Sequence, residues 1–111
     1  MSMRVAFLGL HFAEYSAHLC LALAEAHDVL LFLYEDNARN ELGDRLKTEF
    51  YHPRLQIVTL ERPKGLLRVL GNAKAIVLQV ARFAPDVVHM QEELRDELML
   101  GGVPVWDSLS Y

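Results

Sequence analysis

The sequence predicts an α/β fold of the Rossmann-like class, with a parallel sheet of four to five strands and helices on both faces. Short, continuous apolar runs of the kind found in fully covered strands recur along the chain. Helical patterns alternate with these runs, which is typical of β-α-β units. The length of 111 residues suits a single domain, residues 1–111, built around one hydrophobic core.

The first β-α-β unit is predicted over residues 5–33. Residues 5–9 form an apolar run closed by glycine, which is typical of a central parallel strand. A helix follows over about residues 14–26, and residues 29–33 repeat the buried-strand pattern. The apolar residues of this helix recur at three- and four-residue steps and are expected to face the sheet: Tyr15, Leu19, Ala22, Leu23 and Ala26.

The middle of the chain is predicted to hold a surface helix and a third strand. Residues 36–50 are mostly polar and permit a weakly amphipathic helix interrupted by Gly43. Residues 55–60 follow a proline and are rich in β-branched residues, so they are expected to form the strand. The apolar face of the surface helix consists of residues four apart: Leu42, Leu46 and Phe50.

A long helix is predicted over residues 64–84, because Pro85 ends the pattern. A fourth strand over 86–90, a short helix over 92–98 and the start of a fifth strand at 103–106 follow. The long helix carries an apolar stripe that is expected to pack on the sheet, formed by Leu66, Leu70, Ala73, Ile76, Val77, Val80 and Phe83. It also carries four cations: Lys64, Arg68, Lys74 and Arg82.

Charge and composition exclude several classes of protein. The net charge of −4 is the wrong sign for a protein that grips a nucleic-acid backbone. No apolar run is long enough for a membrane span. The lone Cys20 cannot form an internal disulfide and is expected to be buried and inert, which fits a reducing, cytoplasmic compartment.

The motifs of the common cofactor sites do not occur in the sequence. The first strand ends at Gly9 without the G-x-G-x-x-G spacing of dinucleotide folds, and a P-loop and a G-x-S-x-G nucleophile elbow are missing too. No histidine or cysteine pair has metal-ligand spacing, so neither a cofactor nor a metal is predicted. Glu35 ends the second strand, where a carboxylate binds ribose in dinucleotide folds, but a solvated carboxylate is the preferred interpretation.

Candidate binding residues follow the strands, because ligands of open parallel sheets bind outside the carboxyl ends of the strands. These segments are residues 9–16, 34–37, 61–65 and 89–93. In the first segment, His11 and Ser16 are hydrogen-bond donors for a ligand's hydroxyl or phosphate oxygens. The alternative for Ser16 is that its hydroxyl satisfies the first turn of the helix.

The end of the fourth strand is the richest candidate, with His89, Gln91, Glu92 and Glu93 within five residues. An imidazole there can orient a hydroxyl or transfer a proton, and carboxylates offer general acid or base groups. The alternative is that His89 packs at the strand end and that the glutamates begin a solvated helix, stabilised by its dipole.

Three segments of the chain resemble the N-terminal domain of family 4 glycosyltransferases, which have the GT-B architecture. They are the opening residues 3–9, the helix end and second strand over 21–29, and the sequence Phe-Ala-Pro-Asp-Val-Val-His-Met-Gln-Glu at 83–92. The resemblance implies retaining transfer of a sugar from a nucleotide-sugar donor to an acceptor, with this domain holding the acceptor.

The resemblance also assigns roles to individual residues. His89 matches the family's histidine at the end of the fourth strand and Glu92 its acidic residue, so both are the predicted catalytic residues. Gln91 is a predicted substrate-binding residue, together with His11 and Ser16, which are predicted from their position after the first strand. Gln91 replaces a second histidine of many members, and Leu10-His11-Phe12 replaces consecutive glycines against the donor diphosphate.

The donor-binding domain of the family would lie beyond residue 111, so the chain is expected to be a partial enzyme that does not transfer sugar alone. The alternative is a stand-alone Rossmann-like binding or regulatory module that acts through self-association or a partner chain. A weaker alternative is a fragment of a sugar-nucleotide epimerase. The cations of the long helix could contact a membrane surface peripherally, although a solvated helix face is the preferred interpretation.

Overall fold

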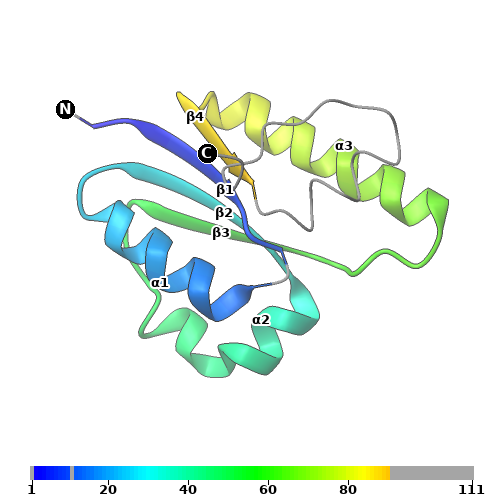
Figure 1. The fold of residues 1–111 in the computed structure, drawn as a ribbon, viewed down its shortest axis with the longest axis horizontal. Coiled ribbons are helices and arrows are strands. Elements are labelled where there is room, and N and C mark those ends of the chain that lie inside the picture. Colours follow the sequence, from blue (N-terminus) through cyan, green and yellow to red (C-terminus); the bar gives the residue numbers. More distant parts are fainter. Residues whose placement is uncertain (1, 11, 91–111) are drawn as a thin grey trace.

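The computed structural model describes residues 2–10 and 12–90, and in this part of the chain four strands form one parallel sheet (Figure 1). The strand order is β3-β2-β1-β4, so an α/β, Rossmann-like fold is confirmed. The predicted helix at 92–98 and fifth strand at 103–106 lie outside the described residues. The elements are β1 (Arg4–Leu8), α1 (Ala13–Ala24), β2 (Asp28–Tyr34), α2 (Glu35–Glu41), the 3₁₀ helix η1 (Gly43–Lys47), β3 (Leu55–Leu60), α3 (Leu66–Phe83) and β4 (Val87–Met90).

The sheet separates two apolar clusters, because alternate side chains of each strand point to opposite faces. In β2, Val29, Leu31 and Leu33 face α1, α2 and η1, whereas Leu30, Phe32 and Tyr34 face α3. All six side chains are buried, which explains why this strand appears in the sequence as a continuous apolar run. The helices α1 and α2 therefore cover one face of the sheet and α3 covers the other (Figure 1).

Helix α1 packs on the sheet through small side chains rather than through the predicted apolar stripe. Tyr15 is 64% exposed, Ala22 and Ala26 are exposed too, and only Leu19 and Leu23 of the predicted face are partly buried. The prediction of the helix was thus right to within two residues at each end, but the prediction of its buried face was wrong. The residues that are buried recur at three- and four-residue steps: Ala13, Ser16, Ala17, Cys20 and Ala24.

The weak helix predicted after β2 is two short helices. Gly43 has a positive φ of 54°, a conformation that glycine adopts without steric cost, and the chain changes there from α2 to η1. The predicted apolar spacing is confirmed, because Leu42 and Phe50 are buried and Leu46 packs against the same cluster. These side chains extend the core on the face of the sheet that α1 covers.

Helix α3 uses about half of its predicted stripe. Ile76, Val80 and Phe83 pack against the cluster of Leu8, Leu30 and Phe32, whereas Leu66, Leu70 and Val77 are exposed. The face that contacts the sheet is rotated away from the centre of the predicted stripe. The prediction that Leu66, Leu70 and Val77 pack on the sheet was therefore wrong. The helix ends at Phe83, where Ala84 adopts a left-handed conformation before Pro85.

Arg4 and Asp86 join the start of β1 to the end of α3 and the start of β4. The backbone N–H of Arg4 donates to the Asp86 carboxylate (2.9 Å), and the Asp86 N–H donates to the Arg4 carbonyl oxygen (2.7 Å). The Arg4 guanidinium donates to the Phe83 carbonyl oxygen (2.8 Å) and lies 4.3 Å above the Phe83 ring centroid. These contacts set the register in which Phe7 pairs with His89.

Within the described part of the chain, none of the helices combines the length and the apolarity that crossing a membrane requires.

The packing of α1 predicts opposite outcomes for two substitutions of the same type in one helix. Ala17→Leu adds volume at a fully buried position and should lower the free energy of unfolding by about 1–3 kcal/mol. Ala22→Leu adds the same atoms at an exposed position and should change it by less than about 0.5 kcal/mol. Urea unfolding of the two variants measures the difference, and a larger loss for Ala22→Leu would contradict the observed helix orientation.

Candidate functional site

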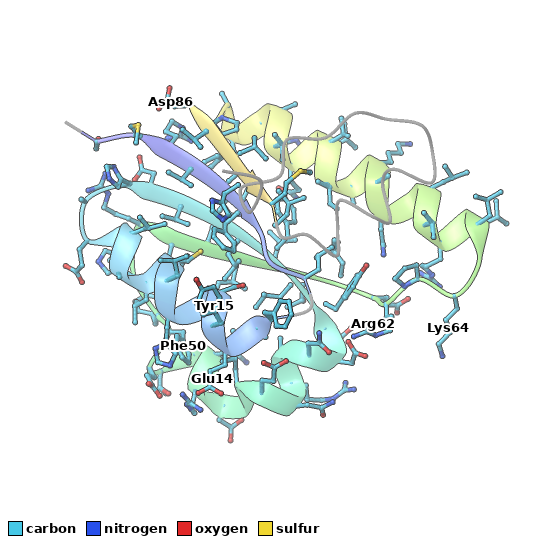
Figure 2. All side chains as sticks on the ribbon, viewed as in Figure 1. Glu14, Tyr15, Phe50, Arg62, Lys64 and Asp86 are labelled. Carbon is cyan, nitrogen blue, oxygen red and sulfur yellow. The ribbon has the colours of Figure 1, made fainter. Side chains whose placement is uncertain are left out.

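The carboxyl ends of the four strands meet at one edge of the sheet, because all four run parallel. The sheet also has a point at which the strand order reverses, since β1 has β2 on one side and β4 on the other. In open α/β sheets the crevice beside such a reversal is the usual ligand site. Figure 2 shows Asp86 at the opposite end of the sheet from Arg62 and Lys64, so the last two mark the carboxyl edge.

The loop after β1 is held by close packing against α1. A side chain at Gly9 would meet the Ser16 Oγ at 2.1 Å, the Ser16 Cβ at 2.6 Å and the Phe7 ring at 2.9 Å. Gly9 is therefore required for the approach of helix to strand, whatever the loop binds. The Gly9 carbonyl oxygen accepts hydrogen bonds from the Phe12 N–H (2.9 Å) and from the Ser16 hydroxyl (3.5 Å).

Ser16 is fully buried, so its hydroxyl faces the interior rather than an open surface. It makes no capping hydrogen bond to the backbone of α1 and donates to the Gly9 carbonyl oxygen instead. The structure thus places this predicted substrate-binding residue in the contact between α1 and the end of β1. A ligand would reach the hydroxyl only after the loop had moved.

His89 lies one residue before the carboxyl end of β4, on the same face of the sheet as Phe7. The two residues pair in register, and their rings stack with centroids 4.5 Å apart and an angle of 10° between the planes. The imidazole is half-buried, and the Phe7 ring on which it stacks belongs to the core beneath α1. This stacking fixes the orientation of the histidine at the point where the strand order reverses.

The other predicted site residues, His11, Gln91, Glu92 and Glu93, lie outside the described residues. The described residues Leu10 and Met90 directly precede these residues in the chain. Leu10 is tied to the neighbouring strand, because its carbonyl oxygen accepts hydrogen bonds from the Tyr34 N–H and from the Asn37 side chain, both at 3.2 Å. Met90, the last residue of β4, pairs with Leu8 of β1.

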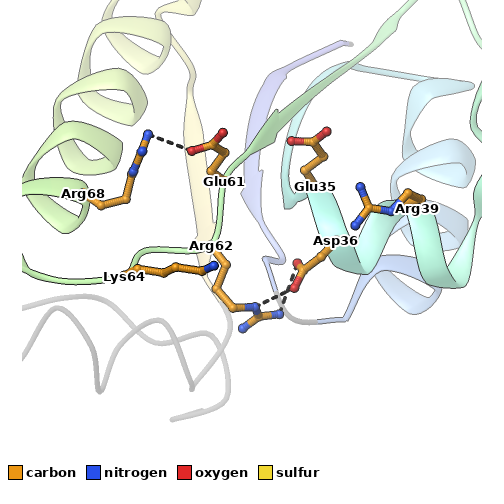
Figure 3. A pocket seen from close by; sticks show the side chains of 7 residues that line it. All are labelled: Glu35, Asp36, Arg39, Glu61, Arg62, Lys64 and Arg68. Carbon is orange, nitrogen blue, oxygen red and sulfur yellow. Dashed lines mark hydrogen bonds and ion pairs between the residues drawn. The ribbon is translucent and has the colours of Figure 1, made fainter.

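A second candidate site, which we call the charged pocket, opens at the carboxyl ends of β2 and β3. It lies at the same edge of the sheet as the ends of β1 and β4. It is open to solvent, has a volume of about 410 Å³, and lies between α2 and the start of α3 (Figure 3). The sequence predicted candidate segments at 34–37 and 61–65, and the pairing of β2 with β3 brings the two together. The charged pocket is lined by Glu35, Asp36, Arg39, Glu61, Arg62, Lys64 and Arg68.

Two ion pairs organise the charged pocket. Arg62 donates to the Asp36 carboxylate (2.8 Å) and to the Asn37 side-chain oxygen (2.8 Å), and its guanidinium lies 4.8 Å from the Tyr34 ring centroid. The hydrogen bond from Arg62 is the main reason why the pKa of Asp36 lies below its usual range. On the other wall, Arg68 pairs with Glu61 at 2.7 Å.

The remaining groups of the charged pocket can bind a ligand that carries both an anionic group and hydroxyls. Arg39 and Lys64 are cations that make no ion pair within the described residues, and Glu35 is an acceptor for hydroxyl groups. Sequence reasoning missed Arg39 and Arg62 as site residues, although Arg62 lay in a named segment. Within residues 2–10 and 12–90, no cluster of three histidine, cysteine or acidic side chains is arranged to hold a metal ion.

Cys20 belongs to α1 and is buried on the side of the helix that packs against the sheet, as predicted. Burial raises the pKa of its thiol to about 12, so the thiolate needed for nucleophilic chemistry is scarce at neutral pH.

Comparison of the chain with protein-family models, with curated proteins and with solved structures gives no match.

The ion pair across the charged pocket predicts a specific titration. Arg62→Gln removes the donor and should raise the pKa of Asp36 toward its usual range, which NMR titration of the Asp36 carboxyl carbon measures. Arg54→Gln is the matched control, because Arg54 lowers the pKa of Asp28 in the same way and should leave Asp36 unchanged.

The sign of the effect on stability follows from the lowered pKa. The contribution of Asp36 is present above the usual pKa of aspartate and is lost as the pH falls through the lowered value. The parent protein should therefore lose more stability over that acid range than Arg62→Gln does. An Asp36 pKa that is the same in both proteins would show that the ion pair does not form in solution.

Proposed function

We propose that this chain is the N-terminal, acceptor-side part of a glycosyltransferase that uses a nucleotide-sugar donor. The observation that carries the proposal is the position of His89 at the end of β4, against β1, where the strand order of the sheet reverses. That point is the usual ligand crevice of open parallel sheets. The motif that ends in this histidine is also the part of the sequence that most resembles family 4 glycosyltransferases.

In the proposed reaction, His89 contacts the acceptor. Its imidazole is held against Phe7 by ring stacking, so a sugar hydroxyl beside it would meet a group of fixed orientation. An imidazole that is oriented in advance can accept or return a hydroxyl proton without a further loss of side-chain freedom. We propose Glu92 as the acidic catalytic partner, and His11 and Gln91 as residues that bind the substrate.

The charged pocket is proposed to bind the far end of the acceptor. It opens at the same edge of the sheet as His89, and it combines cations with a carboxylate that can accept hydrogen bonds from hydroxyl groups. Arg39 and Lys64 suit an anionic substituent, and Glu35 suits a hydroxyl. An acceptor that contacts both His89 and the charged pocket would be an extended polar molecule, with a hydroxyl at one end and an anionic group at the other.

The nucleotide-sugar donor is proposed to bind mainly to a second domain, so this chain alone should not transfer sugar. The reaction is proposed to take place in the cytoplasm, where nucleotide-sugars are available. The end of β1 supports this assignment of the donor to a second domain. A diphosphate is usually held by a glycine-rich loop, whereas this chain has the single Gly9, which packs against Ser16.

A stand-alone module that acts through self-association or a partner chain is the second candidate. The observation that favours it is the edge strand β4, which pairs only with β1 among the described strands and whose Val87 and Val88 are each 42% exposed. An edge strand with exposed apolar side chains is a template for pairing with another chain.

Isothermal titration of the chain with UDP-glucose and GDP-mannose tests the proposal. We expect no tight binding of either nucleotide-sugar, because the residues that would hold the donor are proposed to lie in another domain. Micromolar binding of a nucleotide-sugar would overturn the division of labour. Analytical ultracentrifugation separates the two candidates, since the module predicts association that grows with concentration and the acceptor domain predicts a monomer.

A further inference from the structure

The outward face of α3 is apolar. In an α-helix, residues three, four and seven apart lie on one side, so a set of exposed leucines and valines at this spacing forms a continuous strip. The strip begins in the first turn of the helix, where Leu67 is almost fully solvent-exposed. We call the following residues the α3 strip, with their exposed fractions: Leu66 72%, Leu67 87%, Leu70 56%, Val77 65% and Leu78 49%.

Cations surround the α3 strip. From residue 62 to residue 85 the sequence contains no aspartate or glutamate, although the whole chain has a net charge of −4. Lys74 follows Leu70 by four residues and precedes Leu78 by four, so it emerges within the strip. Lys64 lies just before the helix and Arg82 lies in its last turn, whereas Arg68 is paired with Glu61 at 2.7 Å.

The strip occupies an accessible place in the fold. The first turns of α3 project beyond the sheet at the side of the molecule where β3 ends (Figure 1). The sheet-facing residues Ile76, Val80 and Phe83 belong to the second half of the helix, so the first half makes little contact with the core. A flat surface can therefore approach Leu66, Leu67 and Leu70 without displacing core contacts.

We propose that the α3 strip docks on the surface of an anionic lipid bilayer. Leucines that enter the boundary between headgroups and acyl chains, with lysines and arginines reaching the headgroups around them, are the pattern of helices that lie in a membrane interface. Because residues 62 to 85 contain no aspartate or glutamate, this segment carries no carboxylate that would repel anionic headgroups.

A second copy of this chain is a poorer occupant for electrostatic reasons. In a symmetric dimer the same patch meets itself, so Lys74 and its neighbouring cations would face the same cations of the partner. A bilayer that contains anionic lipid instead neutralises them. Docking in this way would bring the charged pocket, which shares Lys64 and Arg68 with the cationic surround, close to the membrane surface. The inference is independent of sugar transfer.

Co-sedimentation with vesicles tests the inference. The full chain should bind vesicles made of equal parts phosphatidylglycerol and phosphatidylcholine, and it should bind pure phosphatidylcholine vesicles much more weakly. Rising salt should release it, because added salt screens the attraction between the cations and the lipid charges. Absence of binding to the anionic vesicles, or equal binding to both vesicle types, would overturn the proposal.

Variants of exposed residues locate the contact. Leu67→Ser should weaken binding at least about tenfold, because it removes a leucine from the interface. Lys74→Gln should weaken it about fivefold, which corresponds to one cation near an anionic surface. Both side chains are exposed, and circular dichroism confirms that each variant is folded.

The matched controls lie on the other side of the sheet. Tyr51→Ser removes a 71% exposed aromatic side chain, and Lys47→Gln removes an exposed cation of η1. Both controls should bind as the parent does, and equal losses in controls and test variants would overturn the proposal. A lipid-free dimer that Leu67→Ser abolishes would also overturn it, because the strip would then be the surface of a dimer.

Discussion

The contact between Gly9 and Ser16 is the constraint on which the rest of the fold depends. It brings the end of β1 and the start of α1 so close that a single added carbon at Gly9 would collide with the serine side chain. The other buried residues of α1 are small for the same reason, since larger ones would lift the helix off the sheet. This close approach sets the spacing between the end of β1 and helix α1.

Two features of that edge follow from the strand order. Because β1 lies between β2 and β4, His89 stacks on Phe7 at the reversal point, and the ends of β2 and β3 form the charged pocket on the other side. The two regions differ in character. The first is half-buried and orients an imidazole against the core, whereas the second is open and carries ion pairs. We propose that an acceptor with a reactive hydroxyl and a distant anionic group uses both.

The sequence was sufficient to predict the four strands of the described residues. The buried strands β1 and β2 are continuous apolar runs, and residues 55–60 were predicted with the bounds that the structure shows. The buried faces of α1 and, in part, of α3 were, in contrast, predicted wrongly from the sequence. The contacting side of α1 consists of alanine, serine and cysteine, which carry a weak hydrophobic signal, while the larger Tyr15 faces solvent. In α3 apolar residues occupy more than one side, so periodicity alone could not choose between the core face and the α3 strip. The charged pocket depends on the pairing of β2 with β3, a long-range contact that no local pattern encodes.

We propose that ligands bind where β1 and β4 end, and chemical-shift mapping of the ¹⁵N-labelled chain with glucose, mannose and glucose 6-phosphate tests this site. We expect that at least one of these sugars shifts the amide signals of Gly9, Leu10, His89 and Met90, and that His89→Phe, which keeps an aromatic ring against Phe7, weakens the effect. Shifts confined to the opposite edge of the sheet, around Arg4 and Asp86, or no shifts with any of the three, would contradict it.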